Sequence, residues 1–400
     1  MAQDKTLYLH LGHGKTGSSF LQAVFATNRA GLAEAGIAYP KAPDEPPVLP
    51  EEGWISSGNG LLLWEEHPEK LGLHETRAAL FSREHLMNEV CGDRHDTLRQ
   101  RVRQLCKTYG FERISMLLLI RDPVDHAISL YHQAVKRGGF TGTLDEYTAG
   151  YSEPRFVRKF LERRPFFGSD FKYDYVIRNY SRHRTRLIML AEAWLGLGED
   201  TLEPRALDTV NRSLTETELE IQRRLNRTLG KSNEMFADLV CTKMPHLKSA
   251  DLVPSPEAQQ QMLGRLKPEI DLVNASIVPG ERYAGDIVEG PMQDTQARLG
   301  LDGDQVDLLA RVLGTEVDHL RAGLLLQRCE ARVLAAELLH TRGQPIQQQL
   351  DDAKEAARIA ANCAALKDQP HLSTWRESLL ERVERLGAQG APPHQSAASA

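Results

Sequence analysis

A short segment of the sequence gathers residue types that bind anions. Residues 12–19 combine three glycines, one lysine and three hydroxyl side chains: Gly12, Gly14, Gly17, Lys15, Thr16, Ser18 and Ser19. A glycine-rich turn that opens a helix presents unpaired backbone N–H groups, and the helix dipole there favours negative charge. The lysine adds a full positive charge, and the hydroxyls add hydrogen-bond donors. The segment therefore predicts a phosphate or sulfate site; the alternative is an ordinary turn after a buried strand.

The residues on either side of this segment supply the elements that would position it. Residues 7–11 have strand character, and an apolar helical pattern continues from the turn to about residue 35. A nucleoside-triphosphate loop of the Walker A type needs a glycine five positions before Gly14-Lys15-Thr16, and Leu9 stands there instead. The segment is therefore an incomplete match to that loop.

A second candidate site follows the most apolar run of the chain. Residues 114–120 predict a central strand, and Arg121 comes directly after it. Asp122 and Pro123 suit the start of a helix, which would carry Ser129 about 10 Å further along. Arginine binds phosphate with two parallel hydrogen bonds, so a phosphate that contacts both Arg121 and Ser129 would lie beside this helix. A Walker-type kinase or ATPase needs an aspartate at the place of Arg121 to hold Mg²⁺, which weakens that interpretation further.

Together the two segments resemble the binding motifs of sulfotransferases that use 3′-phosphoadenosine-5′-phosphosulfate (PAPS), particularly bacterial ones. The loop shares His10, Gly12, residues 15–19 and the pair Leu21-Gln22, and the second segment shares residues 121–125 and Ser129. The resemblance covers residues 1–290 loosely. It implies that the 5′-phosphosulfate is bound by Gly14, Lys15, Thr16, Gly17, Ser18 and Ser19, and the 3′-phosphate by Arg121 and Ser129. The family's next histidine falls four residues after the serine, whereas His132 falls three after it, so His132 receives no role. No metal is implied.

The implied chemistry is in-line sulfuryl transfer to a hydroxyl or amine, on a carbohydrate or small-molecule acceptor that the sequence does not identify. Lys15 would stabilise the charge that develops on the leaving oxygen. Glu84 is our preferred general base, because it follows a second predicted strand at 77–82 and so lies at the carboxyl edge of the sheet. The other candidates for the base are His67, His10 and His85. We interpret Arg212 as part of a helix start capped by Ser213, rather than as a phosphate ligand.

Composition argues against several other classes of protein. The chain has 400 residues and a net charge of −6, so nothing indicates nucleic-acid binding. We interpret the basic and aromatic stretch 155–186 as a pair of amphipathic helices with solvated charges. Five scattered cysteines suggest neither a disulfide framework nor a zinc site, and no apolar run is long enough for a signal peptide or a membrane span, so we expect a cytoplasmic protein. Two alternatives stay open: a P-loop kinase or NTPase, and a non-catalytic interaction protein that keeps the nucleotide fold.

The predicted fold is a P-loop-like three-layer α/β/α domain, with a parallel sheet flanked by helices, over residues 1–291. Residues 186–190 are a candidate fourth strand, and residues 40–60 are rich in proline and glycine and fit no regular element. A helical extension covers 292–386, and a low-complexity tail predicted to be disordered covers 387–400. Apolar residues recur at helical spacing from Val306 to Leu324, so this extension would pack on the core or on a partner, and it offers a surface for homo-oligomerisation.

Overall fold

The structure is a computed structural model that describes residues 4–42, 58–84, 86–203, 212–229, 235–293, 300–301, 303–363 and 369–388. The chain divides into two compact units, residues 1–299 and 300–400. Sequence reasoning puts this boundary at residue 291. Residues 387 and 388 of the expected tail belong to the last helix, and residues 389–400 lie outside the described part, as do residues 43–57 of the irregular segment and His85.

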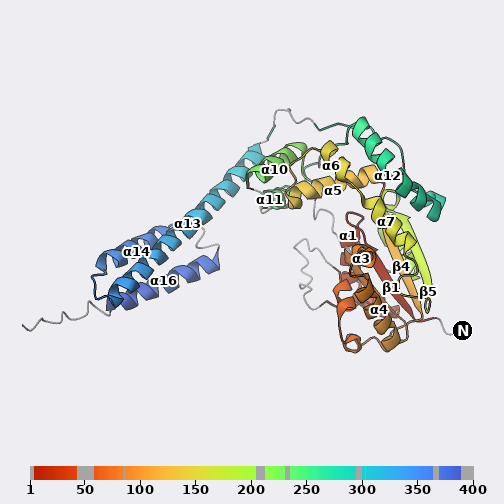
Figure 1. Ribbon diagram of the computed structural model, residues 1–400, viewed down its shortest axis with the longest axis horizontal. Coiled ribbons are helices and arrows are strands. Elements are labelled where there is room, and N and C mark those ends of the chain that lie inside the picture. The colour runs from red at the N-terminus through yellow and green to blue at the C-terminus, as the bar shows by residue number, and fades with distance from the viewer. Residues whose placement is uncertain are drawn as a thin grey trace, which may run out of the picture. The chain divides into compact units, whose positions relative to one another are not determined.

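The first unit is built on a five-stranded sheet with the strand order β2-β3-β1-β4-β5, and every neighbouring pair is parallel. Helices lie on both faces, so the predicted three-layer α/β/α fold is confirmed (Figure 1). The strands are β1 (Thr6–Gly12), β2 (Ile37–Ala38), β3 (Ala78–Glu84), β4 (Arg113–Ile120) and β5 (Lys172–Asn179).

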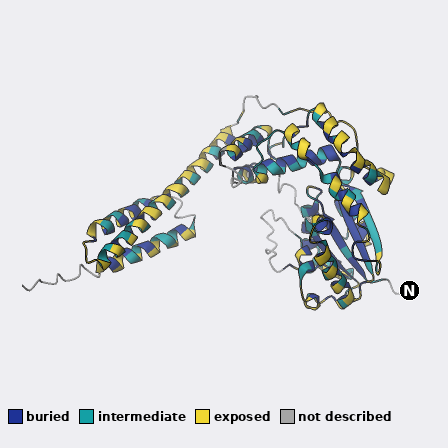
Figure 2. Cartoon of the chain, viewed as in Figure 1, coloured by how far each residue is buried: buried dark blue, intermediate teal, exposed yellow. Residues whose placement is uncertain are grey.

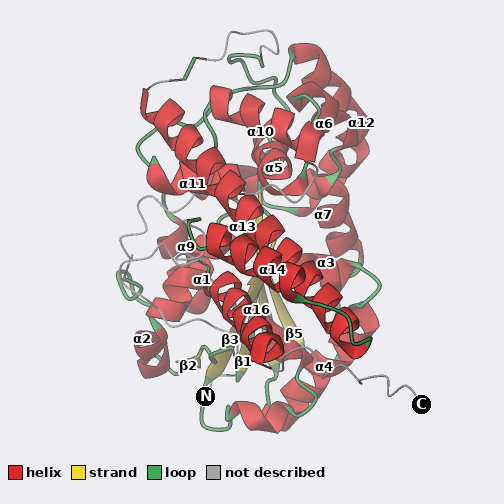
Figure 3. Ribbon diagram, turned by 90° about the vertical axis from the view of Figure 1, so that its left-hand side faces the viewer, coloured by secondary structure: helices red, strands yellow, loops and turns green. Residues whose placement is uncertain are grey.

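The alternation of side chains along the strands separates two apolar layers. Leu7, Leu9 and Leu11 of β1 pack under the helices of one layer, while Leu80 and Leu117 of the neighbouring strands belong to the opposite layer. Figure 3 draws the strands of this sheet in yellow and the helices in red. The first layer contains α3 (Leu86–Cys91), α4 (His95–Tyr109), α7 (Glu153–Glu162) and α12 (Pro256–Ser276); the second contains α1 (Ser18–Thr27), α2 (Arg29–Glu34) and α9 (Leu187–Leu195).

The chain leaves neighbouring strands toward opposite faces, and this defines where a ligand can bind. From β1 it passes through α1 and α2 to β2, whereas from β3 it passes through α3 and α4, on the other face, to β4. In open parallel sheets, ligands bind in the crevice that such a reversal leaves at the carboxyl ends of the strands. The loop after β1, the end of β3 and the residue after β4 all meet at that edge.

Two predictions of secondary structure are wrong. Residues 186–190 are not a strand, because they open α9, whose apolar positions continue through Ala191 and Trp194. The stretch 155–186 is not a helix pair: it holds α7 and then β5, an edge strand with an aromatic and β-branched pattern.

The remaining elements of this unit are α5 (Pro123–Gly138), α6 (Leu144–Gly150), α8 (Tyr180–His183), α10 (Glu216–Leu229), α11 (Met235–Lys243) and the short 3₁₀ turns η1 (Gly60–Trp64), η2 (Pro68–Leu71) and η3 (Pro279–Glu281).

The second unit consists of three described helices with a core of their own: α13 (Gly303–Thr341), α14 (Gln347–Ala360) and α16 (Pro370–Ala388). Ala322, Leu326, Cys329, Val333 and Ala336 of α13 are buried in this core. Figure 2 shows buried and exposed residues alternating along α13. In the described part of the chain, no helix has both the length and the apolar character that crossing a membrane requires.

Candidate functional site

Two glycines allow the loop after β1 to fold tightly against its neighbours. Gly12 pairs in register with Glu84 of β3, and a Cβ on Gly12 would lie 2.3 Å from the carbonyl oxygen of Arg83. Gly17 has a φ of +82°, which only glycine adopts readily, and it precedes the first residue of α1. Lys15 also has a positive φ, of 60°. The sequence therefore folds into a turn that carries the lysine at its tip.

Side chains below the turn fix its backbone. The Thr16 hydroxyl donates a hydrogen bond to the carbonyl oxygen of His13 at 2.6 Å, and Ser18 points to the same oxygen at 3.5 Å. Nε2 of His126, on α5, donates to the carbonyl oxygen of Gly14 at 2.7 Å. Burial lowers the pKa of His126 well below its usual range, so the ring is neutral at pH 7. The hydroxyl of Thr16, with a weaker contribution from Ser18, therefore braces the backbone of the turn.

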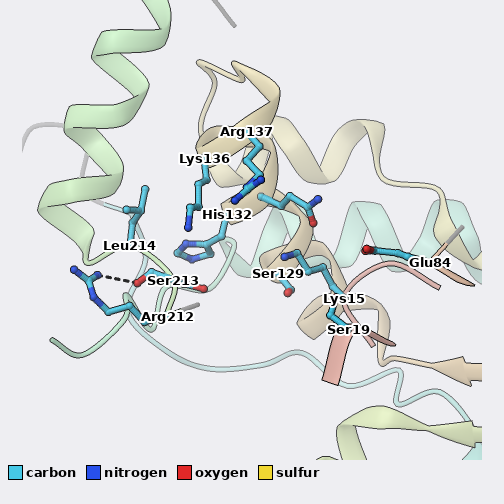
Figure 4. A pocket seen from close by; sticks show the side chains of 11 residues that line it. Lys15, Ser19, Glu84, Ser129, His132, Lys136, Arg137, Arg212, Ser213 and Leu214 are labelled. Carbon is cyan, nitrogen blue, oxygen red and sulfur yellow. Dashed lines mark hydrogen bonds between the residues drawn. The ribbon is translucent and has the colours of Figure 1, made fainter. Parts of the chain in front are cut away.

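A cavity of about 210 Å³ opens above this turn. It contains Lys15 and Ser19 of the loop, Glu84 at the end of β3 and Ser129 of α5, so it unites residues from the two predicted binding segments and the candidate base (Figure 4). The full lining is Lys15, Ser19, Glu84, Ser129, His132, Gln133, Lys136, Arg137, Arg212, Ser213 and Leu214. Of the six loop residues predicted to bind the donor, the structure places only Lys15 and Ser19 in this wall.

The charges around the cavity favour an anion. Four cationic side chains and one carboxylate line it: Lys15, Lys136, Arg137 and Arg212 against Glu84. Desolvation lowers the pKa of the Lys15 ammonium, and the nearby Glu84 carboxylate opposes that shift. Asp238 of α11 accepts from Arg137 at 3.1 Å and lies 3.1 Å from Nζ of Lys136. An anion would complement the positive charge that remains.

Arg121 lies beside the loop but does not line the cavity. Its guanidinium makes two hydrogen bonds to the carboxylate of Asp125, at 2.8 and 2.6 Å, and donates a third to the carbonyl oxygen of Lys15 at 2.9 Å. The Asp125 carboxylate also accepts from Ser181, and Arg121 together with Ser181 holds its pKa below the usual range even though burial opposes the shift. Arg121 therefore links the start of α5 to the backbone of the lysine turn.

Arg212 has a structural partner, in agreement with the interpretation of a helix start. Its guanidinium binds both carboxylate oxygens of Glu218, at 2.7 and 2.8 Å, and donates to the carbonyl oxygens of Ser213, Val240 and Met244. These bonds use all five of its N–H donors, so none is left for a phosphate. The expected cap at Ser213 is wrong: Thr215 and Glu218 bind each other's backbone N–H groups in a capping box.

Two of the histidine candidates for the base, His10 and His67, are not part of the cavity wall. His10 is buried on β1, where its Nδ1 is 2.7 Å from the Ser82 hydroxyl, and burial lowers its pKa to about 4. His67 is exposed on the segment that starts η2, 3.2 Å from Glu69. His85 lies outside the described residues. Glu84 is thus the candidate that the structure brings to Lys15.

The polar face of α5 forms one wall of the cavity, and sequence reasoning assigns a ligand role to only one of its residues, Ser129. Ser129, His132, Gln133, Lys136 and Arg137 follow one another at the three- and four-residue spacing of a helix face. His132 is 7% exposed, its Nδ1 is buried without a hydrogen-bond partner among the described residues, and burial lowers its pKa to about 4. The signal in the sequence is the polar spacing that continues from Ser129 along this helix, although His132 falls one residue short of the family's histidine position.

Comparison with known proteins adds nothing to this geometry: no protein-family model, no curated protein and no solved structure matches the chain. Among the residues that the structure describes, no group of three or more His, Cys, Asp or Glu side chains is placed to hold a metal ion. The case for function therefore depends on the site itself.

Proposed function

We propose that this chain is a sulfotransferase that moves the sulfuryl group of PAPS to a hydroxyl or amine of a carbohydrate or small-molecule acceptor. The observation that carries the proposal is the shared cavity of Lys15, Ser19 and Ser129, which come from two segments far apart in the sequence. The sequence motifs assign these segments to opposite ends of one donor molecule. The cavity is smaller than the ~300–1,000 Å³ of typical ligand sites, so it would receive the anionic part of the donor rather than the whole nucleotide.

In the proposed reaction the acceptor oxygen or nitrogen attacks sulfur while the bond from sulfur to the bridging oxygen breaks. The bridging oxygen leaves as part of the 5′-phosphate of adenosine 3′,5′-bisphosphate and gains negative charge. Lys15, at the tip of the turn, would stabilise that charge most strongly in the transition state. The Glu84 carboxylate would take the acceptor proton, since it lies in the same cavity.

The contacts of Arg121 refine the role proposed for it. Three of its five N–H donors are used by Asp125 and the Lys15 carbonyl, which leaves two for the 3′-phosphate. In this proposal Arg121 both supports the lysine turn and offers part of the 3′-phosphate site. Lys136 and Arg137 of the same helix add positive charge to the cavity wall.

The choice of donor separates this proposal from a P-loop kinase or NTPase. Isothermal titration calorimetry of the full chain with adenosine 3′,5′-bisphosphate, without Mg²⁺, should show binding that Mg²⁺-ATP competes for only weakly. A preference for Mg²⁺-ATP would overturn the proposal. Incubation with ³⁵S-labelled PAPS and a panel of sugars, lipids and small aromatic acceptors should yield a labelled product. Binding of the bisphosphate without transfer to any acceptor would favour the non-catalytic alternative.

We also propose a cytoplasmic location. All five cysteines are free and buried, as expected for a protein of a reducing compartment. Non-reducing electrophoresis of the chain from cells would test this, because a disulfide-linked species would contradict it.

A further inference from the structure

The longest helix of the second unit carries two apolar stripes, and only one of them is buried. Its buried stripe, from Ala322 to Ala336, packs in the core that α13 shares with α14 and α16. A second stripe, which we name the seam, runs from Val306 to Leu338 at alternating steps of four and three residues. The seam consists of Val306, Ala310, Leu313, Val317, Leu320, Leu324, Gln327, Ala331, Leu334 and Leu338.

Every residue of the seam is exposed. Its seven large apolar side chains are 49–67% exposed, and they are all the exposed large apolar side chains that the described part of this helix carries. The steps of four and three are the heptad spacing of a coiled coil, in which Ala310, Val317 and Leu324 take position a and Leu313 and Leu320 take position d. The seam extends over about 50 Å of helix at 1.5 Å per residue. That is more than four heptads of seven residues, and three to four sustained heptads already indicate a coiled coil.

The charges beside the seam indicate which helix would cover it. In a parallel pair of α13 helices, position g of one helix faces the next position e of its partner, so Glu316 would face Arg321 of the second copy, twice by symmetry. In the antiparallel register that keeps the two seams in contact, Glu316 would instead face Glu330 of the second copy, and Arg321 would face Arg321 of the second copy. Like charges at such positions are destabilising, so the charge pattern favours the parallel pair.

We propose that two copies of this chain associate through the seam of α13 as a parallel coiled coil. Each seam side chain then packs against the same residue of the partner, including Gln327, whose amide can hydrogen-bond with its counterpart and so fix the register. The buried stripe lies on the opposite side of the helix, so each copy keeps its three-helix core. The association is independent of the reaction proposed for the first unit.

Sedimentation velocity of the full chain tests this proposal. We expect a dimer at micromolar concentration for the unmodified chain and a monomer for the double variant Leu320→Glu/Leu324→Glu. The matched control, Arg311→Glu/Thr315→Glu, changes exposed residues on the same helix outside the seam and should remain a dimer. Unchanged far-ultraviolet circular dichroism would show that both double variants keep their helices. A monomeric unmodified chain, or a control that dissociates as completely as the seam variant, would overturn the proposal.

Charge reversals test the parallel orientation even if the seam variant fails to fold. Glu316→Lys and Arg321→Glu should each raise the dimer dissociation constant roughly tenfold, since each turns two attractive pairs into repulsive ones. The two changes combined should restore the original value. Tighter association of Glu316→Lys, which would place a lysine opposite Glu330, would refute the parallel pairing.

Discussion

Substitution of Gly17 by alanine tests whether the lysine turn is held in one conformation. The φ of +82° costs an alanine about 1–2 kcal/mol. The new Cβ would also lie 2.7 Å from Cδ1 of Leu187 and 2.9 Å from Cε2 of Tyr180, and such overpacking typically costs about 1–3 kcal/mol. We therefore expect Gly17→Ala to lower the free energy of unfolding by about 2–5 kcal/mol.

Gly14 provides the matched control in the same turn. A Cβ there would meet only Leu130, at 3.9 Å, and its φ lies outside the left-handed region. Gly14→Ala should therefore change the free energy of unfolding by less than about 1 kcal/mol, in either direction.

Urea unfolding followed by tryptophan fluorescence would measure both changes. A Trp375→Phe background removes the tryptophan of the helical unit, so that the signal of the first unit, including buried Trp194, is isolated. Gly17→Ala should also lower the affinity for adenosine 3′,5′-bisphosphate measured without urea, because the strained turn would move the backbone N–H groups that bind the phosphate. Equal effects of the two substitutions on the unfolding free energy would refute the structural reasoning for the turn.

Three further predictions concern residues around the turn. Arg212→Ala should lower the free energy of unfolding by about 3 kcal/mol in the same urea assay, because it removes the cation that pairs with the buried Glu218 carboxylate; a loss under about 1 kcal/mol would contradict a stabilising role for this ion pair. Since the pKa of His10 is about 4 when folded and near 6.5 when unfolded, the unfolded state binds the extra proton between these values, and stability should fall by up to ~3 kcal/mol as the pH drops from 6.5 to 4. His10→Gln should reduce this slope in urea titrations at several pH values, and an unchanged slope would exclude His10 as its source. Arg121→Ala should raise the KM for PAPS more than it lowers kcat in steady-state assays, whereas a fall in kcat alone would assign Arg121 to the chemical step.

The core of the fold could be predicted because its central strands are continuous apolar runs. Residues 114–120 belong to β4, an inner strand with a neighbour on each side, and are buried on both faces. The run 186–190 is apolar after Arg186 but too short to distinguish a strand from a helix by itself, and the helical spacing becomes clear only when the sequence is followed to Trp194. The strand at 172–179 is hard to recognise in the sequence, because it is an edge strand that carries charged residues and many arginines stand around it.

The candidate site was predictable where local backbone chemistry defines it, and not where tertiary contacts do. The turn around Lys15 is specified by its own glycines, so the sequence indicated it. Arg121 pairs with Asp125, and Arg212 pairs with Glu218. Which carboxylate lies within hydrogen-bond distance of each guanidinium depends on the tertiary structure and does not follow from residue types alone. That residues of α5 line the same cavity as Lys15 depends on the packing of α5 beside the turn, which the sequence does not specify.

The affinity of the Lys15→Ala variant for adenosine 3′,5′-bisphosphate tests the central claim most directly. Loss of a charged hydrogen bond to phosphate should weaken binding by roughly 10- to 150-fold in titration calorimetry without Mg²⁺. Lys107→Ala removes an exposed lysine of α4 and should bind like the unmodified chain. Equal affinities of the Lys15→Ala and unmodified chains would contradict the account.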